Sequence, residues 1–146
     1  MSDLRRARPH DVDQVVALIK DFYLIDGHVY DHGRVTAGLM PLLEDDRFGQ
    51  VWLIGGTDNF ADGYAVVTWS WSLESGGRDC ILDELYLPTR GTGLGAAALA
   101  EVTAAAAAVG ARAMFLETEH HNERVRGFYS RNGFAVEDSV WMSRAL

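Results

Sequence analysis

A glycine-rich turn with one arginine is the segment of this sequence whose residue types and spacing best suit chemistry. The apolar run 81–88 precedes it and an alanine-rich run follows it, which predicts a strand, a turn and a helix. Backbone N–H groups at a helix start lack partners and carry partial positive charge, and glycines let an anion come close. We therefore expect a phosphate to bind there. The residues of this predicted anion site are Arg90, Gly91, Thr92, Gly93, Leu94, Gly95 and Ala96.

Two adjacent carboxylates interrupt the apolar strand before the turn. Glu84 lies among leucines and a tyrosine, where a charge costs free energy unless it has a partner or a function. A primary amine is mostly protonated at neutral pH and must lose a proton before it can attack a carbonyl. Glu84, directly or through a water, is the first candidate for that general base. Asp83, expected on the opposite face of the strand, is the second. A structural ion pair between Glu84 and an arginine is the alternative.

A second motif lies about thirty residues after the first, and together the two resemble the GNAT superfamily, the Gcn5-related N-acetyltransferases that use acetyl-CoA. The family's pyrophosphate signature, Gln/Arg-x-x-Gly-x-Gly/Ala, is matched by Arg90, Gly93 and Gly95. The C-terminal pattern is an Asn, a bulky residue and a Tyr six and seven positions later, and then Gly-Phe. It is matched by Asn122, Phe128, Tyr129, Gly133 and Phe134.

The resemblance implies a role for each matched position. The turn would hold the pyrophosphate of acetyl-CoA, and the backbone of Leu85, Tyr86 and Leu87 would pair with the pantetheine arm. Asn122 would lie near that arm, although the same side chain could simply cap the last helix. Tyr129 would protonate the departing CoA thiolate, although it could also be a core aromatic beside Phe128.

The implied reaction is direct acetyl transfer to a primary amine in a ternary complex, without a metal. Acidic residues near the strands favour a small cationic acceptor, such as a polyamine, an aminoglycoside or a lysine-like amine. The candidate acceptor-binding residues are Trp69, Trp71, Glu74, Asp83 and Asp26. The tryptophans could instead pack under a helix or a dimer partner. Two other functions stay open: a non-catalytic acyl-CoA sensor, and an acetyltransferase for protein N-termini or lysines.

Composition limits the class of protein. With 146 residues, 48% of them hydrophobic, the chain is expected to form one domain, residues 1–146. A formal net charge of −8 argues against nucleic acid or a membrane surface as partners. Cys80 is the only cysteine, so no internal disulfide can form, and a cytoplasmic protein is expected. The resemblance also implies a homodimer, with the Trp-bearing strand as a candidate edge.

Hydrophobic periodicity and turn residues predict the elements that must position these groups. Helices are expected at 11–25, 31–44, 96–108 and 122–132, with Pro41 kinking or splitting the second. Most of the surface of helix 96–108 is expected to be covered, because it carries a single charge. Strands are expected at 4–8, 50–54, 64–73, 79–87, 113–117 and 140–143. The order β-α-α-β-β-β-α-β-α-β indicates a mixed α/β fold. The family's version is a twisted, mostly antiparallel sheet with a splayed central strand pair and flanking helices.

Overall fold

A computed structural model describes residues 3–146 of the chain. Its backbone divides into two compact units, one that extends to Leu116 and one over Glu117–Leu146, and each is described by itself. The elements of the first unit are β1 (Leu4–Arg6), η1 (Pro9–Asp11), α1 (Val12–Asp26), α2 (His32–Glu44), β2 (Gly49–Ile54), β3 (Gly63–Ser72), β4 (Gly77–Tyr86), α3 (Leu94–Ala108) and β5 (Met114–Phe115). The second unit contains α4 (Glu123–Arg131).

The five strands form one sheet in the order β1-β2-β3-β4-β5. The first four pair antiparallel with their neighbours, and β5 pairs parallel to β4. The predicted mixed sheet with an antiparallel middle is thus confirmed. β3 lies between β2 and β4, so the prediction that the Trp-bearing strand forms an edge is wrong over most of its length. Only its last residues, beyond Thr68, extend past the ladder with β2.

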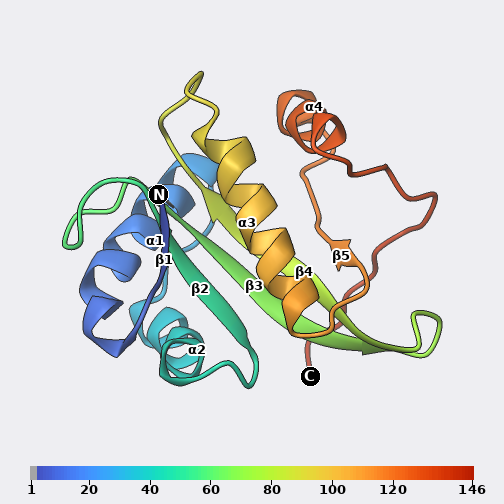
Figure 1. The fold of residues 1–146 in the computed structure, drawn as a ribbon, viewed down its shortest axis with the longest axis horizontal. Helices are drawn as coiled ribbons and strands as arrows, with labels where there is room; N and C mark the ends of the chain where they lie inside the picture. Colours follow the sequence, from blue (N-terminus) through green and yellow to red (C-terminus); the bar gives the residue numbers. More distant parts are fainter. Residues whose placement is uncertain (1–2) are drawn as a thin grey trace. The chain divides into compact units, whose positions relative to one another are not determined.

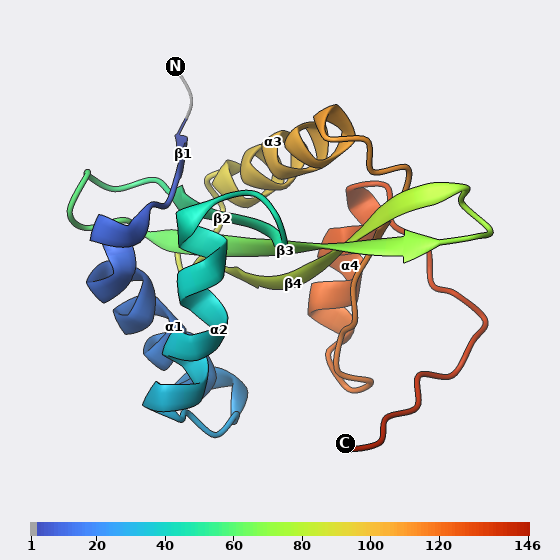
Figure 2. The ribbon, with the colours of Figure 1, turned by 90° about the horizontal axis from the view of Figure 1, so that it is seen from below.

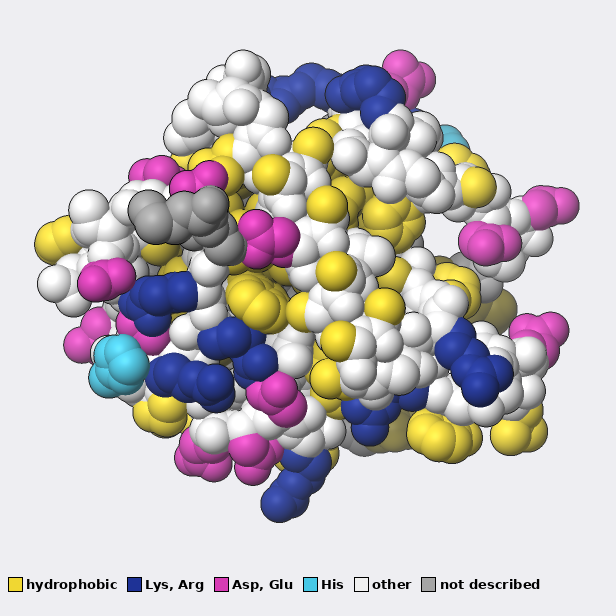
Figure 3. Space-filling model, in the orientation of Figure 1, with side chains coloured by type: hydrophobic (Ala, Val, Ile, Leu, Met, Phe, Trp, Pro, Cys, Tyr) yellow, Lys and Arg dark blue, Asp and Glu magenta, His cyan; other side chains and the backbone are white. Residues whose placement is uncertain are grey.

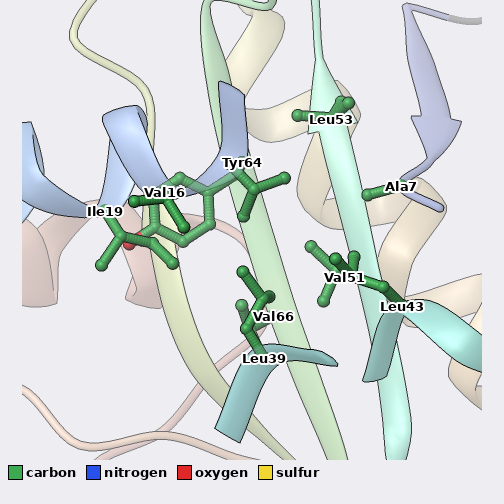
Figure 4. Packing of buried hydrophobic residues seen from close by; sticks show 10 residues of the cluster. Ala7, Val16, Ile19, Leu39, Leu43, Val51, Leu53, Tyr64 and Val66 are labelled. Carbon is green, nitrogen blue, oxygen red and sulfur yellow. The ribbon is translucent and has the colours of Figure 1, made fainter. Parts of the chain in front are cut away.

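The helices of the first unit cover both faces of the sheet. α1 and α2 lie on one face and α3 on the other (Figures 1 and 2). Alternate residues of β2 and β3 pack beneath α1 and α2, as Figure 4 shows. The buried residues of this cluster are Ala7, Val15, Val16, Ile19, Leu39, Leu43, Val51, Leu53, Tyr64 and Val66.

Local sequence signals set the ends of α1 and α2. Gly27 ends α1 with φ 73°, a left-handed conformation that glycine adopts readily. The side chain of Asp31 accepts a hydrogen bond from the Arg34 N–H and so caps α2. Pro41 lies inside α2, and the helix runs through it without a break to Glu44, so the expected split does not occur. The expected side-chain cap of α1 by Asp11 is absent, because that carboxylate bonds to Arg5, the Arg8 N–H and Gln14 instead.

A β-bulge interrupts β4 at the two carboxylates. Val67 faces Leu82, but the preceding residue of β3, Val66, faces Glu84, so Asp83 is an extra residue without a partner of its own on β3. The simple alternation that predicted Asp83 and Glu84 on opposite faces therefore does not run unbroken through β4. Residues that face each other across a ladder share a sheet face. Glu84 thus lies on the α1 and α2 side, with Val66.

β4 and β5 pair over a short stretch only. Their register pairs are Cys80↔Met114 and Ile81↔Phe115. Among the described residues, β4 continues to Tyr86 with a partner only on its β3 side. This free edge of β4 is the predicted splay of a central strand pair.

The alanine-rich helix is less covered than expected. Its buried residues, Ala98, Leu99, Val102 and Ala106, lie on one side, whereas Ala97, Ala100, Thr103, Ala104, Ala107 and Ala108 are exposed. The small hydrophobic side chains along this helix are visible in Figure 3. The prediction that most of the surface of helix 96–108 is covered is therefore wrong for the isolated chain. Alanine is frequent in helices because its helix propensity is high, and that preference does not require burial.

The second unit contains α4 and an irregular tail. Asn122 caps α4, and Gly133 follows the helix with φ 93°, as predicted. Residues 134–146 have no strand, so the strand expected at 140–143 is wrong. A strand needs a neighbour to satisfy its backbone groups, and the described part of this unit offers none. Within residues 3–146, no helix has the length and apolar character needed to cross a membrane.

Candidate active site

The carboxylate of Glu84 is held by two tyrosine hydroxyls from two other elements. Tyr23, on α1, donates a hydrogen bond of 2.5 Å to Glu84 Oε2, and Tyr64, on β3, donates one of 2.7 Å to Oε1. The expected alternative, an ion pair between Glu84 and an arginine, is not among its contacts in the described chain. Each carboxylate oxygen keeps a second lone pair that could accept from a water or an amine.

Opposing effects act on the pKa of Glu84. Burial raises it above its ordinary value, and the nearby charge of Asp83 raises it further. The two tyrosine hydrogen bonds and the nearby imidazole of His28 lower it. The net effect is a raised pKa, which suits a carboxyl that must accept a proton near neutral pH. Burial, together with the nearby Glu84 carboxylate, raises the pKa values of Tyr23 and Tyr64, so both phenols keep their protons.

Asp26 and His28 lie beside this group, where α1 ends. His28 Nε2 is 2.7 Å from Asp26 Oδ2, and the His28 ring meets the Tyr23 ring edge-on at 5.6 Å. Of the predicted residues, Asp83 acts directly on Glu84, and Asp26 is connected to it through His28. The structure adds Tyr23, whose hydrogen bond to Glu84 the sequence did not reveal, and His28, whose charge acts on the Glu84 carboxyl. Tyr23 has the helical spacing of an apolar core position, so the sequence pattern predicted packing for its ring and gave no sign of a hydrogen bond from its hydroxyl.

The predicted anion site has the backbone that close approach of an anion requires. Gly91 and Gly93 have φ values of 76° and 78°, and a Cβ built on either would have no atom within 4 Å, so the space beside them is open. Gly93 is the N-cap of α3, which starts two residues before the predicted helix. Thr92 Oγ1 accepts from the Leu94 N–H, while the next two N–H groups, of Gly95 and Ala96, fall in the first turn, where an α-helix provides no acceptor.

The segment between Glu84 and this turn lies at the free edge of β4. Leu85 and Tyr86 face Ala65 and Tyr64 on β3, and Leu87 follows the strand. All three are half-buried. The Tyr86 ring stacks on Phe22 of α1 at 5.3 Å between ring centroids. Backbone groups on the side away from β3 are therefore free of a strand partner in the described chain, as pantetheine pairing would need.

The second unit contains the other two predicted residues. The side chain of Asn122 accepts from the Val125 N–H at 3.2 Å, which is the helix-capping role. The Tyr129 ring packs edge-on against Phe128 and Phe134, with centroids 5.2 and 5.5 Å away. Burial raises the pKa of Tyr129 to about 12.

Three predicted acceptor residues lie away from Glu84. Trp69 and Trp71 face Cys80 and Arg78 and so lie on the opposite sheet face. Glu74 is exposed in the turn between β3 and β4. At about 3.3 Å per residue, the six steps along β4 from Arg78 to Glu84 span about 20 Å. The structure does not bring these three side chains together with the carboxylate.

In residues 3–146, Cys80 and the histidines are not arranged as a metal site. Burial raises the pKa of the Cys80 thiol to about 11, so it is protonated at neutral pH. The His32 ring nitrogen Nδ1 hydrogen-bonds to the Tyr30 hydroxyl at 2.8 Å. Within residues 3–146, no three side chains of the metal-ligating types converge.

Comparisons with known proteins bear on the family and the fold of this chain. The family model described as "Acetyltransferase (GNAT) family" matches residues 63–134, which include β3, β4, the glycine-rich turn and α4. A comparison with curated proteins found no match. Several solved structures share the fold.

Two of these structures have more than a quarter of their residues in common with this chain. The integron cassette protein HFX_CASS3, from the mobile metagenome of Cole Harbour Salt Marsh, is 34% identical, with a TM-score of 0.86 over 99% of this chain and 90% of its own. A candidate acetyltransferase from Arthrobacter sp. FB24 is 26% identical, with a TM-score of 0.85 over 100% and 97%.

A more distant structure shows the fold alone. The aminoglycoside N-acetyltransferase AAC(6')-Iy, crystallised with CoA, is 19% identical, with a TM-score of 0.74 over 99% of both chains. The family match covers the strand, turn and helix that build the site, and the fold is shared from end to end. The chain belongs to the GNAT family of acetyltransferases.

Proposed function

We propose that residues 1–146 form one acetyltransferase domain that transfers an acetyl group from acetyl-CoA to a primary amine. The observation that carries this proposal is the half-buried Glu84 carboxylate, on the strand that leads to the glycine-rich turn, which accepts hydrogen bonds from Tyr23 and Tyr64. The pKa of this carboxyl is raised, two phenols donate to it, and each of its oxygens keeps a lone pair for a further donor.

The residues of the turn fit the cofactor. Gly91 and Gly93 leave open space beside the backbone, the first turn of α3 supplies N–H donors, and Arg90 supplies charge. Leu85, Tyr86 and Leu87 would pair with the pantetheine arm along the free edge of β4, and Asn122 would lie near it. When bound, acetyl-CoA supplies a thioester that a neutral amine can attack. The CoA complex of AAC(6')-Iy supports this assignment by fold only.

Two side chains of this chain would move the protons. Glu84 would accept the amine's proton on one of its carboxylate oxygens, directly or through a water. Tyr129 would hold a proton at its hydroxyl for delivery to an anionic leaving group. Its raised pKa keeps the phenol protonated at neutral pH. The transfer would be direct, without a covalent enzyme intermediate.

The acceptor would be a small cationic amine, such as a polyamine, an aminoglycoside or a lysine-like amine. Asp83, next to Glu84, and Asp26, which pairs with His28, are the groups that would attract the ammonium form. The aminoglycoside acetyltransferase meta-AAC0020, solved with sisomicin, shares the fold at 16% identity and supports only the acceptor class. Trp69, Trp71 and Glu74 are left out of this proposal because they lie away from Glu84.

An amine panel tests the proposal. Free thiol release from acetyl-CoA is followed with polyamines, aminoglycosides, lysine derivatives and a peptide with a free N-terminus. We expect turnover with a small amine, and a loss of about 10²-fold or more in kcat/KM for Glu84→Gln, the usual size of a general-base effect. Glu44→Gln, an exposed position at the end of α2, is the matched control.

The panel also separates the rival functions. Tight binding of acetyl-CoA without turnover of any amine would support a non-catalytic acyl-CoA sensor instead. Turnover of the peptide alone would support a protein acetyltransferase. Unchanged kinetics of Glu84→Gln would show that Glu84 is not the base.

A further inference from the structure

We propose that Tyr23 and Tyr64 are positioning residues for the reaction, because together they hold both oxygens of the Glu84 carboxylate. This inference rests on the proposed role of Glu84 as the base. The two hydroxyls come from α1 and β3, whereas the carboxylate is on β4, so three separate elements determine the geometry.

Two donors fix the carboxylate in a way that one donor cannot. A single hydrogen bond leaves the carboxylate plane free to turn about the bonded oxygen. With Oε2 held at 2.5 Å and Oε1 at 2.7 Å, both the position and the plane are set. The remaining lone pairs then point in fixed directions, which is what proton transfer to a base requires.

The bulge at Asp83 makes this arrangement possible. If β4 had no bulge, Val66 would face Asp83, and Glu84 would face Ala65 on the α3 side of the sheet. The observed register instead pairs Glu84 with Val66, on the face where the fully buried Tyr64 lies. Figure 4 shows the Tyr64 ring among the core side chains, with its hydroxyl at the edge of the cluster.

A purely structural role for the two phenols makes a different prediction. The hydroxyls of the buried Tyr64 and the half-buried Tyr23 both use Glu84 as their partner, so loss of either hydroxyl would change stability whether or not the residue also positions the base. A positioning role also requires that the proton affinity of Glu84 change. Groups from every neighbouring element act on this carboxyl: Tyr23 and His28 from α1 and its end, Tyr64 from β3 and Asp83 from β4.

The direction of the change follows from the contacts. Each tyrosine bond stabilises the charged form and lowers the pKa of Glu84, so removing one hydroxyl raises it. The base acts only when deprotonated, and activity therefore rises with pH through that pKa. Tyr23→Phe and Tyr64→Phe should each move the acid limb of kcat/KM upward by about one pH unit, a tenfold loss well below the limb.

The experiment compares the wild type, Tyr23→Phe, Tyr64→Phe and Tyr30→Phe. Tyr30 is the control because its ring neighbours Tyr23, but its hydroxyl bonds to His32. The pH profile of kcat/KM is measured with a turned-over amine. The pKa of Glu84 is measured separately, by NMR titration of protein with carbon-13 at the glutamate carboxyls, with Glu84→Gln assigning the signal. Thermal unfolding checks that each variant is folded.

Upward shifts of the Glu84 titration in both tyrosine variants, and none in Tyr30→Phe, would support the inference. It would be overturned if both variants titrate like Tyr30→Phe. Full activity of Glu84→Gln would instead reject the proposed base, while the NMR titration would still decide whether the two hydroxyls control this carboxyl. If Tyr64→Phe does not fold, Tyr23→Phe provides the same test from α1.

Discussion

Glu84 faces Val66 across the β3–β4 ladder, on the sheet face that α1 and α2 cover. Because Val67, the next residue of β3, faces Leu82, a bulge at Asp83 separates the two pairs. This relationship decides which carboxylate enters the space beside Tyr23 and Tyr64 and which is left outside. The general base of the proposed reaction thus depends on one extra residue in a strand.

Gly93→Ala should weaken cofactor binding through the backbone. At φ 78° a Cβ costs about 1–2 kcal/mol, and it would fill the open space beside the turn. We expect at least about a tenfold loss of CoA affinity by calorimetry. Gly110→Ala is the matched control, because Gly110 also has a positive φ, 97°, and open space but lies after the other end of α3. Equal loss of CoA affinity in both variants would contradict a role of the turn in binding.

Arg90→Gln should raise the KM for acetyl-CoA with little change in kcat. A charged hydrogen bond to a phosphate contributes about 1.5–3 kcal/mol, which corresponds to a tenfold or larger effect. Because Arg90 is exposed, the difference from wild type should shrink as salt increases. Steady-state kinetics at two ionic strengths measure both effects. Arg34→Gln, an exposed arginine near the start of α2, should leave the KM unchanged.

Tyr129→Phe should lower kcat and leave the affinity for CoA nearly unchanged. Loss of a general acid costs about 10²-fold or more. Burial raises the pKa of this phenol to about 12, so the wild type keeps the proton over about pH 6 to 10 and the loss should be the same throughout. Ser130→Ala, an exposed neighbour on α4, is the control. A wild-type kcat for Tyr129→Phe would show that the residue is only a packing aromatic.

Asp11→Asn should remove acid-sensitive stability. The bidentate pair with Arg5, at 2.9 and 2.7 Å, lowers the pKa of Asp11 to about 2 from the ordinary 3.8. A depressed carboxyl pKa stabilises the fold above the unfolded-state value and loses that effect as pH falls through the folded-state value. The contribution is about 2 kcal/mol, present above pH 4 and lost towards pH 2.

Urea unfolding at several pH values checks this prediction for Asp11. The stability difference between wild type and Asp11→Asn should shrink as the pH is lowered from 5 to 2. Asp13→Asn, an exposed position in the first turn of α1, should follow the wild-type pH dependence. A constant difference across that range would mean that the ion pair does not hold the Asp11 pKa down.

Most elements, and the residues of the glycine-rich turn, could be predicted from local sequence signals. Apolar periodicity, caps and turn residues act locally, so the helices after Asp31 and Asn122 and the end of α1 at Gly27 could be predicted from them. The glycines of the turn are also a local signal, because glycine is the residue that readily adopts the positive φ values a turn of this kind needs. The two spaced motifs were sufficient to suggest the family that the comparisons show.

The positions and partners of the two carboxylates depend on contacts between elements that are far apart in the sequence. The bulge at Asp83 depends on how β4 pairs with β3, and the contacts of Tyr23 and Tyr64 with Glu84 join positions 61 and 20 residues apart in the chain. The strand predicted at 140–143 failed for the same reason. An apolar run can become a strand only where a neighbour satisfies its hydrogen bonds, and sequence periodicity contains no information about that neighbour.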